Sequence, residues 1–209
     1  MPSPAQDARA TIPVEEPVAE RATALYPSLL GASWDLLPEA VRRGHDTSRP
    51  LCYRGALSVR RGPSAAARLV AALLRLPPAG EGVPVQLVVT PEWEGCRWCR
   101  SFGARTLTTR QFRRGDRLVE RFGILDLLFA PYVEAGRLRY RQTAAALGFG
   151  RLRLPLPRPC MPVVAADAWV PAGETEMRIE VQVAAPLVGI VLTYGGTVTA
   201  VPAIGEEGS

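Results

Sequence analysis

The sequence predicts a mainly β (α+β) domain, built as an antiparallel curved sheet or β-barrel of about nine or ten strands. Apolar and polar residues alternate with period two from Val83 almost to the end of the chain, as in strands with one buried face. Short turns containing Gly, Pro or Asp separate the strands, and a parallel crossover needs about a dozen residues, so neighbouring strands are expected to pair antiparallel. So many strands in one domain must close or stack to hide their edges, and we favour a barrel or half-barrel over a sandwich.

One domain is expected over residues 22–202. A chain of 209 residues is long enough to bury a core and short enough for a single barrel. The two ends, residues 1–21 and 203–209, lack a periodic apolar pattern and are predicted to be disordered tails. No secretory signal opens the chain, and no apolar run approaches the roughly 20 residues of a membrane span, so we expect a cytoplasmic protein.

The net charge of +5 does not indicate a nucleic-acid partner. All 25 basic residues are arginine and they are spread along the chain, a usage that we attribute to a GC-rich genome. A nucleic-acid surface concentrates basic residues on one element, with aromatic residues or a known module, and neither is found. We therefore expect a solvated basic surface and no nucleic-acid binding.

The four cysteines do not form a recognisable metal site. Cys96 and Cys99 have the C-x-x-C spacing, but the residues around them alternate like a strand, and strand residues three apart point to opposite faces. There is no second C-x-x-C and only one histidine. We expect no metal and no disulfide, only reduced structural thiols.

Two short helices are expected to lead the domain, over residues 22–30 and from residue 36 to about residue 43. Asp35 is placed as the cap of the second helix, and Pro38 is tolerated in its first turn. A strand follows over residues 52–60.

The clearest helix is predicted over residues 64–76, and it is amphipathic. Its apolar stripe is expected to pack on or across the sheet: Leu69, Val70, Leu73, Leu74 and Leu76. Arg68 and Arg75 share the opposite side. A basic amphipathic helix also lies on membranes in some proteins, so peripheral membrane contact stays open as an alternative.

The other predicted strands follow one another as hairpins, and they span residues 83–93, 94–102, 105–113, 117–122, 124–133, 137–146, 163–170, 175–185 and 191–201.

Several short motifs follow one another in an order and with a spacing that point to one family. They are LYPSLLGASWDLLPEAVRRGHD, ARLVAALLRLPPAGEGVPVQL, RWCRSFG, LVERFG, GRLRYR, LRLPLPRPCMP and APLVGIVLTYGGTV. Over roughly residues 25–201 the chain resembles a bacterial family of domains of unknown function, family four-one-six-six, found alone or attached to reductase-like modules. The resemblance implies no established activity, so no catalytic residue is carried over from it.

Two tight turns predict which residues share the interior of the sheet. With Gly103–Ala104 and Gly115–Asp116 as two-residue loops, Trp98 faces Thr109, and Gln111 faces both Cys96 and Glu120. The interior set is then Cys96, Trp98, Arg100, Phe102, Leu107, Thr109, Gln111, Leu118, Glu120 and Phe122. Polar side chains among aromatic ones are what a ligand cavity would contain.

Arg100 and Glu120 are the most unusual members of that interior. In this register they lie four residues and two strands apart, about 13 Å along the strands, so we expect no direct contact between them. Because an unpaired buried charge costs several kcal/mol, Glu120 should bond neighbours such as Gln111 or hold a proton. Arg100 should meet a carboxylate such as Asp126, water or a ligand anion. A structural network and a ligand-facing site both remain open.

The strand over residues 137–146 extends the same interior. Tyr140 and Gln142 fall on its apolar face, opposite three arginines. A tyrosine hydroxyl there either donates to a ligand carbonyl or is satisfied by the backbone. Tyr194 has the same status, and His45, beside Asp46, is interpreted as a loop or cap residue in preference to a general base.

The function predicted from these residues is the binding of a small, largely apolar molecule that is polyketide-like or lipid-like. No cofactor is expected. The chain has no phosphate loop, dinucleotide fingerprint, H-E-x-x-H or G-x-S-x-G motif. A cofactor-independent isomerase or cyclase would use Glu120, Arg100 and Tyr140 as catalytic groups. The ligand-binding candidates are Trp98, Phe102, Thr109, Gln111, Phe122 and Gln142. The alternative is a non-catalytic membrane-associated or protein-interaction domain.

Overall fold

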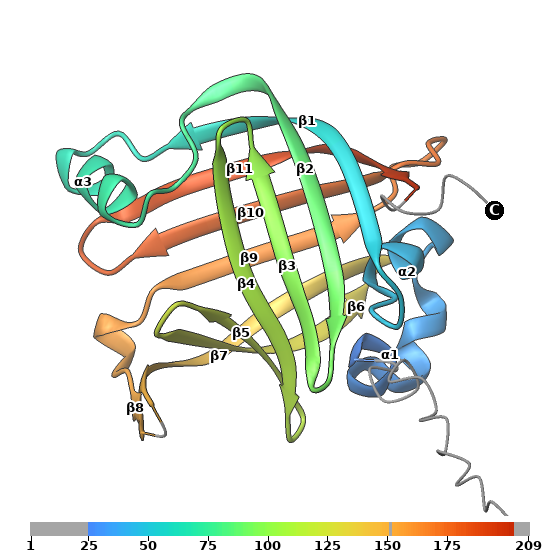
Figure 1. Ribbon diagram of the computed structural model, residues 1–209, viewed down its shortest axis with the longest axis horizontal. Helices are drawn as coiled ribbons and strands as arrows, with labels where there is room; N and C mark the ends of the chain where they lie inside the picture. Colours follow the sequence, from blue (N-terminus) through green and yellow to red (C-terminus); the bar gives the residue numbers. More distant parts are fainter. Residues whose placement is uncertain (1–24, 151, 203–209) are drawn as a thin grey trace, which may run out of the picture.

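A computed structural model describes residues 25–150 and 152–202, in which an antiparallel sheet closes into a barrel (Figure 1). The sheet has eleven strands, and the ring closes because β1 pairs with β11 and β6 pairs with β7. The strands are β1 Leu51–Arg61, β2 Gly80–Glu92, β3 Gly95–Phe102, β4 Arg105–Arg114, β5 Arg117–Phe122, β6 Leu125–Glu134, β7 Arg137–Phe149, β8 Leu152–Pro155, β9 Val163–Trp169, β10 Met177–Ala185 and β11 Gly189–Val201.

The predicted barrel and its ten predicted strands are confirmed, and one strand was missed. β8 pairs only with the last residues of β7, where Leu152 faces Phe149, and it lies outside the ring of the other ten strands. Its four residues end in Pro155 and are too few to show a period of two. The predicted tails, residues 1–21 and 203–209, lie outside the described residues.

Because the strands run antiparallel, their connections alternate between two ends of the barrel (Figure 1). We call one the plugged end: it holds the N-terminal helices and the β2–β3, β4–β5, β6–β7 and β9–β10 turns. The other is the α3 end. It holds the helix between β1 and β2, the β3–β4, β5–β6 and β10–β11 turns, and the segment from β7 through β8 and the short helix η3 (Arg158–Cys160) to β9.

The predicted leading helices are present, and their residues contribute to the core at the plugged end. They are α1 (Leu25–Leu30), the 3₁₀ helix η2 (Gly31–Leu36) and α2 (Glu39–His45). Tyr26 and Val41 are fully buried in the same cluster as the inward residues of the strands. The predicted cap was wrong: Asp35 lies inside η2, and α2 begins after Pro38, whose carbonyl accepts from the Arg42 amide at 3.0 Å.

The amphipathic helix is also present, as α3 (Ala65–Leu73), but its predicted packing face was only partly right. Ser64 caps it by accepting from the Ala67 amide at 3.0 Å. Ala67 and Ala71 are fully buried, because small side chains let the helix approach the ends of β1 and β11 closely. Leu69, Leu73 and Leu74 of the predicted stripe instead face solvent, whereas Val70 is half-buried and Leu76 is buried. In the described residues, no helix is long and apolar enough to cross a bilayer.

Candidate functional site

The two tight turns produce the predicted register of β3, β4 and β5. Gly103 and Gly115 adopt φ values of +56° and +61°, which glycine tolerates without strain. Trp98 pairs with Thr109, while Gln111 pairs with Cys96 on one side and with Glu120 on the other. The three strands therefore place their alternate residues on a shared inner face, as predicted.

Burial follows this parity with one exception. All predicted inward residues are buried or half-buried, including Phe102 and Leu118, which are at most 1% exposed. Phe122 is half-buried where β5 ends. Val119 has the parity of the outer face yet is fully buried, between its cross-strand neighbours Phe112 and Leu128.

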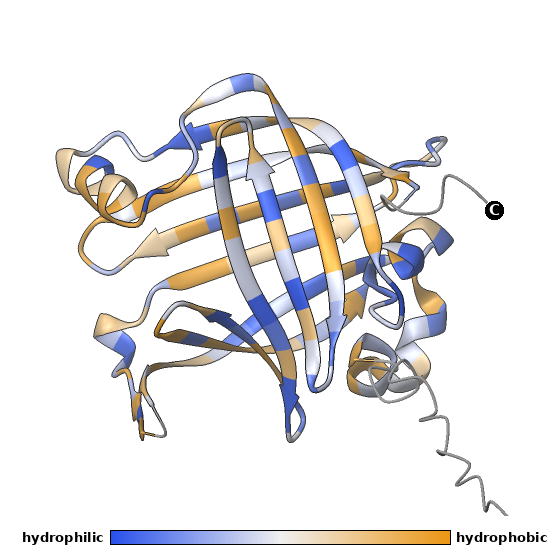
Figure 2. Cartoon of the chain, viewed as in Figure 1, coloured by the Kyte–Doolittle hydropathy of each residue, from blue (hydrophilic) through white to orange (hydrophobic). Residues whose placement is uncertain are grey.

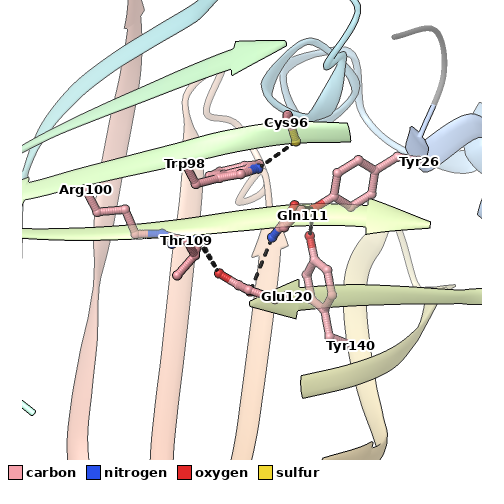
Figure 3. Close-up of polar contacts among 8 residues, drawn as sticks. All are labelled: Tyr26, Cys96, Trp98, Arg100, Thr109, Gln111, Glu120 and Tyr140. Atoms are coloured by element: carbon pink, nitrogen blue, oxygen red, sulfur yellow. Dashed lines mark hydrogen bonds and ion pairs between the residues drawn. The ribbon is translucent and has the colours of Figure 1, made fainter. Parts of the chain in front are cut away.

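Glu120 is the centre of a hydrogen-bonded network inside the barrel (Figure 3). Its Oε1 accepts from the Thr109 hydroxyl at 2.7 Å and from Arg100 Nη2 at 3.0 Å. Its Oε2 accepts from Gln111 Nε2 at 3.3 Å. Arg100 Nη1 also donates to the Thr109 hydroxyl oxygen at 2.8 Å, so four side chains on three strands are joined.

The expectation that Arg100 and Glu120 do not touch was therefore wrong. The two backbone positions are far apart, but both side chains are long and extend toward each other over Thr109 (Figure 3). Asp126 is not the partner of Arg100 either. It lies on the outer face, where Arg121 donates to it at 2.6 and 2.9 Å and Arg153 at 3.1 Å.

Two tyrosines extend the network to the helical plug. The Tyr26 hydroxyl donates to Gln111 Oε1 at 2.7 Å, and the Tyr140 hydroxyl donates to the Tyr26 oxygen at 3.1 Å (Figure 3). Tyr140 was predicted to face the interior and does so, with its ring edge-on to Phe129. Tyr26 was missed, because nothing in LYPSLL distinguishes a tyrosine that reaches a strand from one that fills core.

Aromatic rings line the interior beside this network. The Arg100 guanidinium lies 5.1 Å from the Trp98 ring centroid, within cation–π range. Trp98 Nε1 in turn donates to the Cys96 sulfur at 3.2 Å. Phe102 meets Tyr194 edge-to-face at 5.2 Å, so the latter also contributes to the inner wall.

Gln142 is not part of the network. Its Nε2 donates to the Pro162 carbonyl at 2.7 Å, and its Oε1 accepts from the Val164 amide at 2.7 Å. These two bonds tie β7 to the start of β9, beyond the two residue pairs that the strands share. The structure therefore separates Gln142 from the other candidate residues and gives it a bracing contact.

Burial governs the ionisation of the site. Desolvation raises the pKa of Tyr26, Tyr140 and Tyr194, so these hydroxyls stay protonated, and those of Tyr26 and Tyr140 donate hydrogen bonds. Desolvation would lower the pKa of Arg100, but the charge and hydrogen bond of Glu120 outweigh it and raise that pKa. The site thus holds a fixed positive charge beside its carboxylate partner.

His45 does not form a dyad with Asp46. Its Nδ1 donates to the Val41 carbonyl at 2.8 Å, and its ring packs edge-on against Tyr26 at the end of α2. Burial lowers the pKa of His45 to about 4, which keeps the ring neutral near pH 7. Asp46 instead accepts from the Ser48 hydroxyl at 2.5 Å.

The cysteines occupy the faces that strand parity predicts. Cys96 is buried inside, Cys99 is half-buried outside, and both are free thiols. Burial raises the pKa of Cys96 to about 12, so its sulfur is a poor nucleophile. No cluster of His, Cys, Asp and Glu suited to a metal ion occurs in residues 25–150 and 152–202.

Solvent reaches the charged pair although both side chains point inward. The Arg100 side chain is 17% exposed and the Glu120 side chain 19% exposed. Leu107, which pairs with Arg100 across the strands, and Phe122, two residues beyond Glu120, are also only half-buried. Side chains therefore do not fill the inner face completely.

Two surface hollows lie at the plugged end, away from the Arg100–Glu120 pair. One of about 220 Å³ reaches Cys96 and Gln111 but is otherwise lined by Gly95, Phe112 and charged residues, and it is smaller than the roughly 300–1,000 Å³ of ligand sites. The other, of about 370 Å³, is formed by Pro38, Trp169 and neighbouring turn residues. Neither contains the charged pair. The inner face is taken as the candidate site because it brings Arg100, Glu120 and their hydrogen-bond partners together.

Comparison with known proteins supplies one match. The sequence model of a family described as a domain of unknown function (DUF4166) matches residues 37–198, a range that includes every candidate residue named above except Tyr26. No curated protein and no solved structure matches the chain.

Proposed function

The chain belongs to the DUF4166 family, which is described as a domain of unknown function. From the site itself we propose that the barrel binds a small, largely apolar molecule in its interior. The ligand would be lipid-like or polyketide-like and would carry an oxygen that Arg100 recognises. Trp98, Phe102 and Phe122 would contact its apolar body.

The observation that carries this proposal is a partly exposed ion pair inside an aromatic barrel. Apolar residues of similar size are often as stabilising as a buried ion pair, so folding alone gives little reason to keep Arg100 and Glu120 inside. A ring of eight strands has an interior that side chains fill or that holds one small ligand, and the interior widens with strand number. By this rule a ring of ten strands is wider than a ring of eight.

Arg100 has capacity for a ligand. A guanidinium has five N–H donors, and in the described residues two of its nitrogens donate, to Thr109 and to Glu120. A carbonyl or carboxylate oxygen would accept from the remaining donors. Glu120 holds the guanidinium in place, so the donor geometry exists before the ligand arrives.

The network favours binding over acid–base catalysis. Both carboxyl oxygens of Glu120 already accept hydrogen bonds, from Arg100, Thr109 and Gln111, which hold this group as a partner of the guanidinium. A cofactor-independent isomerase or cyclase remains the enzymatic form of the same proposal. In it Arg100 would polarise a carbonyl, Tyr140 would maintain the tyrosine chain, and the walls would hold one conformer.

Binding of an environment-sensitive fluorescent fatty acid, paired with thermal melts, tests the proposal. Arg100→Met should raise the Kd at least tenfold, about 1.4 kcal/mol, and Glu120→Gln should raise it less because Arg100 keeps its charge. Arg97→Met is the matched control, since this arginine is on the same strand but exposed and paired with Glu92. Lower melting temperatures with unchanged Kd in both interior variants would refute the proposal.

A further inference from the structure

Exposed apolar side chains gather at the α3 end of the barrel. On α3 and just after it, Leu69, Leu73 and Leu74 are 61%, 73% and 44% exposed. These are the leucines that were expected to pack on the sheet, and the buried alanines took their place. Figure 2 shows the apolar colouring of α3 and of the neighbouring β10–β11 turn. These three leucines therefore form an accessible surface.

Other connections at this end expose apolar residues too. Ile124 does so in the β5–β6 turn, Phe149 and Leu152 beside the β7–β8 turn, and Leu187 and Ile190 at the β10–β11 turn. At the plugged end, the exposed large apolar residues in the described part of the chain are Leu36 and Trp93. The exposed apolar residues of the α3 end come from segments far apart in sequence but lie at one end of the barrel, unlike single leucines scattered over a surface.

Leu187 is the clearest member of this surface. It is fully exposed at the tip of its turn, and its φ of +61° is a conformation that bulky side chains rarely adopt. A glycine or asparagine would fit this position with less strain. An apolar side chain kept at a strained and solvent-facing tip points to a contact outside the chain.

Charge follows the same division between the ends. In the α3-end connections, residues 62–79, 103–104, 123–124, 150–162 and 186–188, the described charged residues are arginines: Arg68, Arg75, Arg153 and Arg158. In the strand-to-strand turns of the plugged end, residues 93–94, 115–116, 135–136 and 170–176, they are acids: Glu94, Asp116, Glu174 and Glu176. The N-terminal segment of the plugged end, residues 25–50, carries three acids and three arginines, so the connections with a net positive charge are those of the α3 end.

From this coincidence we infer that the α3 end docks on the surface of an anionic lipid bilayer. Lipid phosphates attract arginines near the surface, and apolar tips enter the boundary between headgroups and acyl chains. The apolar residues stand on separate connections, and a deformable bilayer surface accommodates them better than one rigid protein face does. A second copy is disfavoured, because two such ends would bring arginines against arginines. This inference does not depend on whether the interior of the barrel binds a ligand.

Co-sedimentation of the full chain with vesicles tests the docking surface. The wild type should bind vesicles of mixed phosphatidylglycerol and phosphatidylcholine, and binding should fall at least tenfold on pure phosphatidylcholine or in high salt. The double variant Leu73→Glu, Leu187→Glu should also bind at least tenfold more weakly. The matched control, Leu36→Glu with Trp93→Glu, changes the exposed apolar residues of the plugged end and should bind like the wild type.

Arg68→Glu with Arg75→Glu should remove the salt-sensitive part of binding while leaving the melting temperature within a few degrees, since both arginines are exposed. Equal binding by wild type and the α3-end variants would overturn the inference, as would no binding to anionic vesicles. A concentration-dependent dimer that Leu187→Glu dissociates would also overturn it, because the surface would then serve a second copy.

Discussion

The Tyr26 hydroxyl and the side-chain oxygen of Gln111 are 2.7 Å apart although 85 residues separate them in sequence. This bond links α1, outside the strands, to β4 and through Gln111 to Glu120. Tyr26 is fully buried, so neither water nor a neighbouring side chain at the surface replaces its hydroxyl. The helical plug therefore completes the interior network as well as covering the barrel.

The order of the tyrosine chain predicts unequal effects of removing each hydroxyl. Tyr26→Phe should lower the free energy of unfolding by about 1–2 kcal/mol, because Gln111 Oε1 and the Tyr140 hydroxyl both lose a partner. Tyr140→Phe should cost less, since Tyr26 still donates to Gln111. Urea unfolding of both single variants and the double variant measures this. Equal costs that add in the double variant would contradict the described chain.

Because His45 is buried, we expect the protein to lose stability in mild acid. The unfolded state takes up a proton on this residue below about pH 6.5, whereas burial delays uptake in the folded state to about pH 4. The stabilisation present above pH 6.5 is therefore lost as pH falls through this window, roughly 3 kcal/mol in total.

Chemical unfolding at several pH values, for the wild type and His45→Gln, checks this. The variant has no group that titrates in the window, so the stability difference between the two proteins should shrink as pH falls from about 6.5 to about 4. Parallel pH profiles would show that His45 is accessible to protons in the folded state.

Replacing Asp126 on the outer face should strongly lower the free energy of unfolding. Its side chain is fully buried beneath Arg121, Arg153 and Arg114. Burial would raise the pKa of Asp126, but hydrogen bonds from Arg121 and the charges of the three arginines outweigh it and lower that pKa. Asp126→Asn should cost about 2 kcal/mol or more by leaving these arginines without their carboxylate.

The matched control for Asp126 is Asp116→Asn. Asp116 is 82% exposed and lies 3.4 Å from Arg117, so its loss should change stability by less than about 0.5 kcal/mol. Thermal melts of both variants make the comparison. A similar small effect at the two positions would mean that the arginine cluster is solvated and contributes little.

The inner face of β3, β4 and β5 was predictable because two physical rules act locally there. A two-residue turn sets the register, and a period of two then assigns every side chain to a face. Trp98 opposite Thr109 and Gln111 opposite Glu120 follow from those rules alone. The barrel followed from the number of hairpins and the need to hide their edges.

The contacts that were not predicted depend on the length of side chains and on packing between segments far apart in sequence, and local sequence rules describe neither. The Arg100–Glu120 contact arises from the length of two side chains, and Tyr26 reaches Gln111 only after the ring has closed. The packing face of α3 was decided by close approach of Ala67 and Ala71, and the stripe of larger leucines stayed outside.

The central claim is that the interior receives a small molecule, and native mass spectrometry tests it most directly. Leu107→Trp would fill the inner face opposite Arg100, whereas Thr108→Trp adds the same volume on the exposed outer face one residue away. Each protein, checked by circular dichroism to be folded, is incubated with an apolar extract of its expression host. We predict one bound molecule per chain in the wild type and in Thr108→Trp, and none in Leu107→Trp. No bound molecule in the wild type, or equal occupancy in Leu107→Trp, would contradict the claim.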